Sequence, residues 1–150
     1  MKGDNGTRLM FPQTTSDLRV RWCSPYVKID VAAKAINNDP ALKSAKILFV
    51  TGERRQESTA RSKYAQCEPH RCDNQKRRVD AYRAVIDWDE AQVWAIVRRH
   101  GIDAHPAYHL GYGRLSCQTC IFADADQWAT NRAISPERFA RIAAYEVRFG

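Results

Sequence analysis

Two cysteines near the end of the sequence, Cys117 and Cys120, are separated by two residues in the run HPAYHLGYGRLSCQTCIF. A two-residue spacer turns both sulfurs to the same side, so that one metal centre can bind both thiolates. Redox dithiols use the same spacing, and buried packing is a third interpretation. Because redox dithiols usually open a helix after a strand, whereas this pair follows a Gly-Tyr-Gly turn, a metal site is favoured.

Two cysteines do not complete a tetrahedral site, so the chain must supply further ligands. The candidates are Cys23, Cys67, Cys72 and the histidines. Cys67 and Cys72 flank His70 in a basic loop and could be a fourth ligand, a separate weak site or surface thiols, of which the last is favoured. His105, which precedes a proline, and His109 could be ligands or acid–base groups, but a structural hydrogen-bonding role is more common for such histidines.

A group of basic residues follows a short apolar run. The run Ile47–Val50, closed by Thr51-Gly52, predicts a strand buried on both faces, as in a parallel sheet. The following ERRQESTARSKY predicts a helix start, where guanidinium groups and free helix amides would bind phosphate or sulfate. The anion-binding candidates are Arg54, Arg55, Ser58 and Arg61. The alternative is an amphipathic helix with a basic outer face.

Composition and charge narrow the class of protein. The chain has 150 residues, 44% of them hydrophobic, and a net charge of +7. Residues 54–83 hold nine Lys and Arg against four acidic residues, so an anionic ligand or a solvated basic face is expected there. The sequence has no apolar run of signal or membrane-spanning length, which predicts a cytoplasmic protein with reduced thiols and no membrane partner.

The elements that must position these residues alternate between strand and helix, which predicts an α/β fold. Residues 1–16 are expected to form a flexible arm, and residues 17–150 a single domain. The stretch CEPHRCDNQKRRVD is expected to be a loop. The further expected elements are a helix over Pro25–Asn37, a strand over Tyr82–Trp88, a helix over Glu90–Arg99 capped by Asp89, a helix over Asp124–Arg132 and a helix from Ser135 to about Val147.

Four motifs occur in an order and spacing that resemble the phosphoadenosine phosphosulfate (PAPS) reductase family, especially its phage and prophage members with a cysteine pair. They are RWCSPYVK, TGERRQESTAR, VIDWDEAQVWAIVRRHGIDAHPAYHLGYGRLSCQTCIF and ATNRAISPERFARIAAYE. The resemblance covers about Val20 to Phe149. It implies a Rossmann-like parallel sheet fragment of the adenine nucleotide alpha-hydrolase fold with a helical, cysteine-containing C-terminal part, and an adenine nucleotide such as PAPS or ATP as ligand.

The resemblance also implies roles for individual residues, although it assigns no catalytic residue. The family's G-x-R-x-x-x-S-x-x-R pattern near the bound nucleotide or sulfate falls on Gly52, Arg54, Arg55, Ser58 and Arg61, and a lysine that follows the first cysteine motif falls on Lys28. Cys23, Cys117 and Cys120 match three ligands of a [4Fe-4S] cluster, for which Zn²⁺ is the alternative. Ser24 occupies the position of the fourth cysteine, which leaves a serine or water oxygen, Cys67 or Cys72, or a three-cysteine cluster as options.

Two segments of the family pattern are missing from the sequence: the nucleotide-binding S-G-G-K-D-S loop and the E-C-G-L-H tail. We therefore expect an oxidoreductase or sulfurtransferase of this family that is incomplete without an N-terminal part or a protein partner that carries the loop. One alternative is a non-catalytic module that binds nucleic acid or protein through its basic face and holds a structural metal ion. Another is a remnant that folds only in part.

Overall fold

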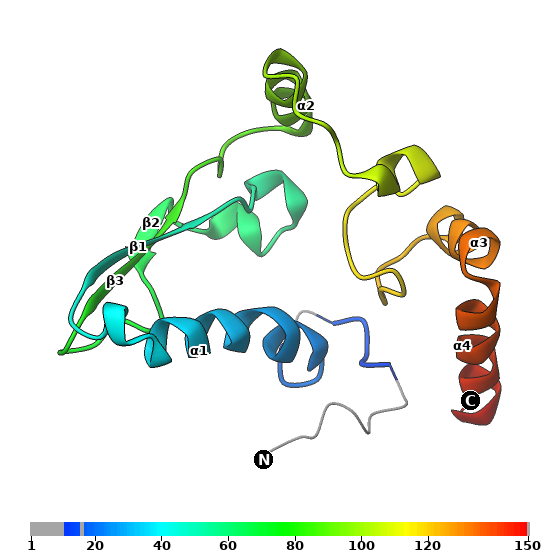
Figure 1. The fold of residues 1–150 in the computed structure, drawn as a ribbon, viewed down its shortest axis with the longest axis horizontal. Helices are drawn as coiled ribbons and strands as arrows, with labels where there is room; N and C mark the ends of the chain where they lie inside the picture. The colour runs from blue at the N-terminus through cyan, green and yellow to red at the C-terminus, as the bar shows by residue number, and fades with distance from the viewer. Residues whose placement is uncertain (1–10, 16, 150) are drawn as a thin grey trace. The chain divides into compact units, whose positions relative to one another are not determined.

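The computed structural model describes residues 11–15 and 17–149, and the chain forms two compact units (Figure 1). Residues 1–28 and 104–150 make up one, the cysteine unit, and residues 29–103 make up the other, the sheet unit. The single domain expected over residues 17–150 stays a prediction, and most of the expected arm over residues 1–16 lies outside the described residues. None of the described helices is long and apolar enough to cross a membrane.

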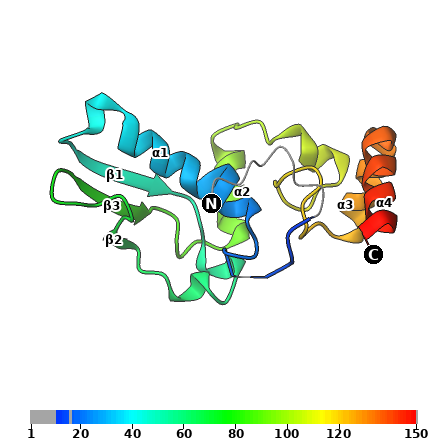
Figure 2. The same cartoon turned by 90° about the horizontal axis from the view of Figure 1, so that it is seen from below.

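The sheet unit is built on three strands, β1 (Lys46–Thr51), β2 (Cys67–Pro69) and β3 (Arg78–Arg83), in the order β1-β3-β2 (Figures 1 and 2). β1 and β3 are parallel, with Ile47 opposite Val79, whereas β2 runs antiparallel to β3. Pro69 lies on the edge strand β2, where its missing N–H leaves no gap in an inner ladder. The protein is therefore a mixed α/β protein, and the predicted parallel pairing is confirmed for β1 and β3.

The core of the sheet unit lies between one face of this sheet and the helix α1 (Asp30–Asn38). Ile47 and Phe49 of β1 pack against Ile36 of α1 and the fully buried Val79 of β3. Lys46, Leu48 and Val50 alternate with these residues and are exposed, and Leu48 is 60% exposed. The prediction that β1 is buried on both faces is therefore wrong, because α1 covers only one of them.

Most of the predicted helices are confirmed. A π-helical segment, Pro25–Ile29, leads directly into α1, which ends where Asp39-Pro40 stops it. α2 spans Glu90–Arg99 and begins with the predicted cap, in which the Asp89 carboxylate accepts from the Gln92 N–H at 2.7 Å. α3 (Ala125–Ile134) and α4 (Pro136–Phe149) complete the cysteine unit, and Asp124 caps α3.

Three predicted elements are wrong. The segment 53–64 contains two short 3-10 turns, Arg55–Glu57 and Arg61–Lys63, rather than a helix, because Ser58 between them is fully extended. The expected loop over residues 67–80 contains β2 and the start of β3. The strand expected over Tyr82–Trp88 corresponds to β3, which begins earlier and ends at Arg83. The residues after Arg83 form a turn, in which the side chain of Ile86 is buried.

Candidate functional site

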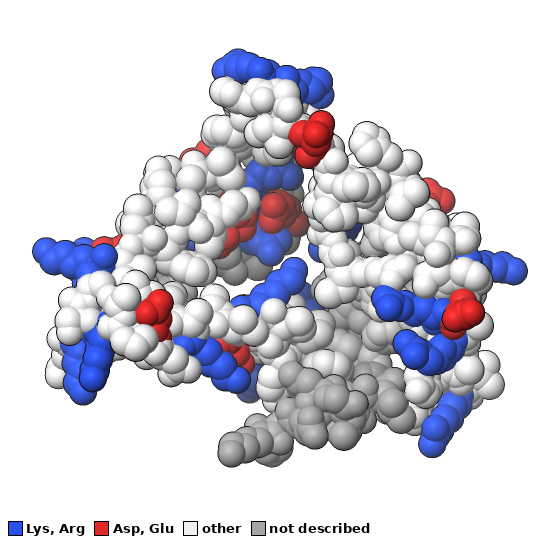
Figure 3. All heavy atoms as spheres, in the orientation of Figure 1, with Lys and Arg blue, Asp and Glu red and all other residues white. Residues whose placement is uncertain are grey.

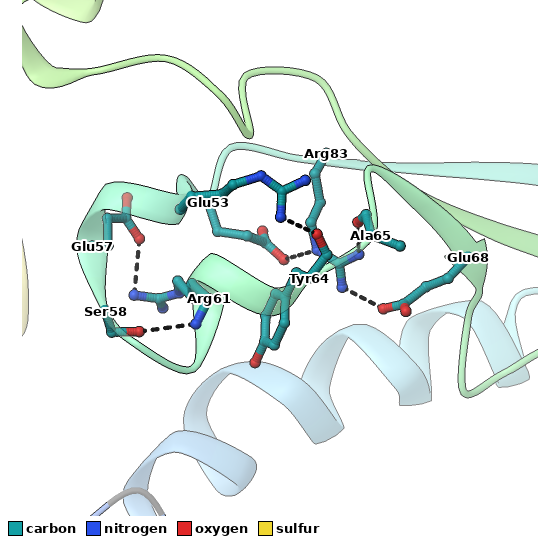
Figure 4. A network of polar contacts seen from close by, with 9 residues as sticks. Glu53, Glu57, Ser58, Arg61, Tyr64, Ala65, Glu68 and Arg83 are labelled. Carbon is teal, nitrogen blue, oxygen red and sulfur yellow. Dashed lines mark hydrogen bonds and ion pairs between the residues drawn. The ribbon is translucent and has the colours of Figure 1, made fainter.

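Arg83, the last residue of β3, is the centre of a polar network beside the end of β1 (Figure 4). Its guanidinium donates to the carboxylates of Glu53 at 2.9 Å and Glu68 at 2.6 Å, and to the Ala65 carbonyl at 2.6 Å. The Tyr64 ring lies over it, 4.6 Å from the guanidinium carbon. Burial lowers the pKa of Arg83, but the hydrogen bonds to Glu68 and Glu53 raise it by more. Arg83 is therefore a fixed cation that joins β3 to β2 and to the segment after β1.

Glu53 follows Gly52 directly and faces Arg83. Partial burial raises the pKa of Glu53, but polar contacts with Thr51, its own backbone N–H and Arg83 lower it by more. The carboxylate is therefore ionised at neutral pH and pairs with a buried cation.

The loop after β1, residues 52–64, carries the arginines of the predicted anion site and is named the arginine loop here. Glu57 pairs with two of them, 2.8 Å from Arg61 and 3.6 Å from Arg54. Arg54 also donates to the Gln56 side chain at 2.8 Å, and Ser58 Oγ accepts from the Arg61 N–H at 3.2 Å. The arrangement brings Arg54, Ser58 and Arg61 together on one short loop, each bonded to a neighbour in that loop.

Arg55 has a structural role in the same loop. Its Nε donates to Asp87 at 2.6 Å, and one terminal nitrogen donates to the carbonyls of Ser62, at 3.0 Å, and Tyr64. Its backbone N–H donates to the Ile86 carbonyl at 2.8 Å. Arg55 thus ties the arginine loop to the turn after β3, with its side chain 34% exposed.

The charges around the arginine loop nearly balance. The three arginines of the loop and Arg83 each pair with at least one carboxylate. These carboxylates are Glu53, Glu57, Glu68 and Asp87. On the face shown in Figure 3, basic side chains form several separate groups, and some of these have acidic side chains beside them. The excess of basic residues in the sequence therefore does not become one free basic face at this loop.

The two other predicted binding residues, Gly52 and Lys28, are both exposed. Gly52 is exposed, and a Cβ added there would meet nothing within 4 Å, so no close contact requires glycine at this position. Lys28 is exposed in the π-helical segment and belongs to the cysteine unit, whereas the arginine loop belongs to the sheet unit.

In the cysteine unit, Cys117 and Cys120 stand at the two ends of a tight turn. The Cys120 N–H donates to the Cys117 carbonyl at 3.1 Å, and the Ala123 N–H donates to the Cys120 carbonyl at 2.9 Å. Cys117 is exposed and Cys120 is half-buried, and both are free thiols. The two residues thus lie on one turn, and the prediction that one metal centre binds both thiolates stays a prediction.

Buried side chains of α3 fix this turn. Asn131 donates to the Gln118 carbonyl at 2.5 Å and accepts from the Tyr112 hydroxyl, while Gln127 donates to Ser116 Oγ at 3.3 Å. Asn131 and Gln127 are 2% and 1% exposed, so these bonds form away from water, where they are strongest. The cysteine turn is thus held by a polar core behind it, which the sequence did not point to.

Cys23 lies in the same unit and is half-buried. Arg21, two residues before Cys23, places its guanidinium carbon 5.4 Å from the centre of the Phe122 ring. Three thiolates suit an iron–sulfur cluster or zinc by their chemistry. Across residues 11–15 and 17–149, however, no three His, Cys, Asp or Glu side chains are grouped so as to hold a metal ion. A cluster on Cys23, Cys117 and Cys120 therefore stays a prediction.

The remaining sulfur and histidine candidates have structural contacts. Cys72 is 5% exposed and belongs to the core of the sheet unit, so the interpretation as a surface thiol is wrong for it, whereas Cys67 is exposed. His70 packs on Phe49 with ring centres 4.7 Å apart, and burial, with the charge of Arg71, lowers its pKa. In the cysteine unit, His105 Nδ1 accepts from the Ala107 N–H at 3.1 Å, in keeping with a structural role.

A shallow hollow of about 270 Å³ lies along α2, lined by Trp88, Gln92, Ala95, Ile96 and Arg99. None of the predicted site residues lines it. The candidate site is therefore defined by the arginine loop and the cysteine turn rather than by this hollow.

The chain is similar to several known proteins. An uncharacterised 37.8 kDa protein of Escherichia phage 186, from the gpa 5' region, is 33% identical over 91% of this chain and 39% of its own length. Adenosine 5'-phosphosulfate reductases of Burkholderia cepacia and Neisseria meningitidis serogroup A are 31% and 28% identical, over 50% and 48% of this chain and 28% of each enzyme. The chain thus spans less than half the length of these relatives. No solved structure matches it significantly.

The family model of the phosphoadenosine phosphosulfate reductase domain matches residues 3–123. The match covers both the arginine loop and the cysteine turn, and it ends just before α3. The resemblance predicted from the four motifs is therefore confirmed, and the chain belongs to the PAPS reductase domain family.

Proposed function

We propose that this chain handles an adenine nucleotide carrying an activated sulfate, such as PAPS or adenosine 5'-phosphosulfate, as an oxidoreductase or sulfurtransferase. The observation that carries the proposal is the position of the arginine loop, directly after parallel strand β1 in a chain of this family. In α/β sheets, ligands bind outside the carboxyl ends of parallel strands. The parallel pair β1–β3 supports the further proposal that the sheet is a fragment of a Rossmann-like sheet of the adenine nucleotide alpha-hydrolase type.

Within the loop, the contacts support different roles for the arginines. Arg54 and Arg61 are the proposed ligands of the anionic group, since each uses only part of its donors on Glu57 and Gln56. Arg55 is proposed to hold the loop, because it bonds to Asp87 outside the loop and to the backbone carbonyls of Ser62 and Tyr64. Gly52 and Ser58 complete the proposed binding set within the loop, and Lys28, in the cysteine unit, stays a predicted ligand.

We also propose that further chain or a protein partner helps to bind the phosphates. This chain covers 39% of its phage relative and 28% of the reductases, and its sequence has no S-G-G-K-D-S loop. An affinity for the nucleotide that rises when the neighbouring gene product is added would support this proposal.

Isothermal titration calorimetry with PAPS, adenosine 5'-phosphosulfate and ATP tests the binding proposal. Arg61→Gln should weaken binding by roughly tenfold, the cost of one charge-assisted hydrogen bond. Arg71→Gln is the matched control, because Arg71 is also exposed and pairs with Asp30 outside the arginine loop. Equal affinities of the two variants would refute the proposed role. Binding of DNA or RNA that falls steeply with salt, without nucleotide binding, would favour the nucleic-acid alternative instead.

Cys23, Cys117 and Cys120 are the proposed ligands of a [4Fe-4S] cluster, with Zn²⁺ as the alternative metal. When bound, a cluster would supply an electron-transfer or electrostatic centre at the cysteine turn. Anaerobic purification followed by measurement of iron, acid-labile sulfide and zinc decides between them. Cys117→Ser and Cys23→Ser should each lower the metal content, whereas Cys67→Ser, in the sheet unit, should not. A metal-free protein would contradict the proposal.

A further inference from the structure

The two edges of the three-stranded sheet differ in how well they are protected against pairing with another strand. β1 and β2 are the outer strands, since the order is β1-β3-β2. β2 has only three residues and carries Glu68 and Pro69, and a short length, a charge and a proline are devices that block an edge. β1 has six residues, KILFVT, with no proline and a single charge, Lys46, at its start. The sheet is therefore protected at β2 and unprotected at β1.

The backbone of β1 points to this unprotected edge at alternate residues. The Arg78 N–H of β3 donates to the Ala45 carbonyl at 3.2 Å, so the odd-numbered residues of β1 face β3 in the parallel ladder. The N–H and C=O groups of Lys46, Leu48 and Val50 therefore point outward. Within residues 11–15 and 17–149, no hydrogen bond reaches these outward groups.

The same residues leave the outer face of the sheet uncovered. Leu48 and Val50 are 60% and 56% exposed, whereas Ile47 and Phe49 pack into the core beneath α1. Parallel strands normally bury both of their faces, because helices cover the sheet on both sides. An unpaired edge beside an uncovered apolar face is a surface to which a further strand can be added.

We propose that β1 binds a strand–helix segment of the polypeptide that completes the domain. An apolar strand of that segment pairs with the outer edge of β1, parallel to it, and the helix joined to this strand covers Leu48 and Val50. The parallel direction follows from the existing pair of β1 with β3, since parallel strands are joined by a helix that crosses one face of the sheet. α1 occupies the inner face, so the added helix lies on the outer one.

The relatives of this chain support this occupant over a second copy of the chain. The match covers 39% of the phage 186 protein, so most of that relative lies outside it. The inference rests on the proposal that further chain or a partner completes the domain, and it deepens that proposal by naming the surface involved. A second copy would pair its β1 antiparallel instead, because a two-fold axis reverses the direction of an edge strand.

Co-expression of the tagged full chain with the part of the phage 186 protein outside the match tests the proposal. Strand pairing needs no nucleotide, so the complex is isolated without one. Amide hydrogen exchange followed by NMR then locates the contact. In the free chain, the Leu48 and Val50 amides should exchange faster than that of Phe49, which faces β3. In the complex, both should slow by roughly tenfold or more, as expected for amides that enter a ladder.

Two variants of one residue separate the face from the edge. Val50→Lys should weaken the complex by roughly tenfold or more, because it removes an apolar contact and places a charge beneath the added helix. Val31→Lys is the matched control, since Val31 is 54% exposed on α1 in the same unit. Val50→Pro removes an outward N–H that is not bonded to β3, so it should weaken the complex through the edge alone.

Equal weakening by Val50→Lys and Val31→Lys, or no complex at all, would overturn the proposal. A concentration-dependent dimer of the free chain with protected Leu48 and Val50 amides would overturn the occupant, because a second copy would then hold the edge. If Val50→Lys does not fold, as judged by circular dichroism, the exchange of the two amides in the unmodified complex decides. A complex with protected amides that binds no nucleotide would refute the nucleotide proposal and support the docking surface.

Discussion

Arg83 donates from Nε to the carboxylate of Glu53 at 2.9 Å and so links the end of β3 to the segment that follows β1. The arginine side chain is 9% exposed, and the Glu53 side chain is 24% exposed. A second carboxylate, Glu68 of β2, accepts from the same guanidinium at 2.6 Å. The position of the arginine loop therefore depends on a cation that none of the loop's own residues supplies.

Replacing Arg83 by methionine should destabilise the sheet unit. The change leaves two neighbouring carboxylates without their cation, and we expect the free energy of unfolding to fall by about 2 kcal/mol. The loss is limited because both carboxylates remain partly exposed to solvent. Urea denaturation monitored by tryptophan fluorescence measures this.

Arg78→Met is the matched control, because Arg78 lies on the same strand with its side chain 69% exposed and pairs with Asp80. An exposed pair of this kind contributes only about 0–1 kcal/mol. Equal losses in the two variants would show that Arg83 does not anchor the strands.

The ionisation of Glu53 should make stability depend on pH in the acid range. Because folding lowers its pKa below the ordinary value of 4.5, its contribution is fully present above pH 4.5 and is lost as the pH falls through the folded-state pKa. Glu53→Gln should therefore flatten the fall of the melting temperature below pH 4.5. Glu137→Gln, at an exposed position in α4, should leave the slope as it is. A slope that is the same in both variants would argue against the pair.

The elements of the fold that could be predicted are those in which several local sequence signals point to the same structure. The helix α2 follows from Asp89 as a cap and Gln92 at the reciprocal position, and both side-chain bonds form. β3 was placed too late, because its inward residues Val79, Ala81 and Arg83 alternate with polar ones and include an arginine. An alternating pattern with a buried cation cannot be told from a basic loop until the distant Glu53 and Glu68 are known to be its partners.

The candidate site could be predicted only in part, because some of its contacts also depend on residues that are distant in the sequence. The spacing of Cys117 and Cys120 predicted a metal-binding pair; the structure shows that the two residues lie on one turn, and metal binding stays a prediction. Asn131 and Gln127, which hold that turn, look like ordinary polar residues of an exposed helix face, and only the approach of the loop shows that they are buried. The sequence also did not reveal that the arginines pair with acidic residues, because these pairs depend on contacts across the fold, such as that of Arg55 with Asp87.

Asn131→Asp should loosen the cysteine turn. The substitution keeps an acceptor for the Tyr112 hydroxyl but replaces the donor to the Gln118 carbonyl with a charged oxygen, so that two acceptors face each other. We expect a loss of about 1–3 kcal/mol in the free energy of unfolding and faster alkylation of Cys117 and Cys120. Asn38→Asp, at an exposed position at the end of α1, is the control for the added charge. Unchanged alkylation rates would mean that the turn holds its shape without α3.

Glu57→Gln tests whether the arginine loop is held partly neutral until an anion arrives. The Glu57 carboxylate lies 2.8 Å from Arg61 and 3.6 Å from Arg54, the two proposed ligands, and therefore competes with any anionic group for them. Removing its charge should raise the affinity for PAPS by roughly twofold to tenfold at low salt, and by less at high salt, because the pair is solvent-exposed and screened.

Calorimetric titrations at two salt concentrations measure this effect, with Glu137→Gln as the control for net charge. A rise in both variants would indicate a general charge effect. A fall in Glu57→Gln alone would show that Glu57 positions the two guanidinium groups for the ligand, which would reverse the role assigned to it while keeping the ligand on Arg54 and Arg61.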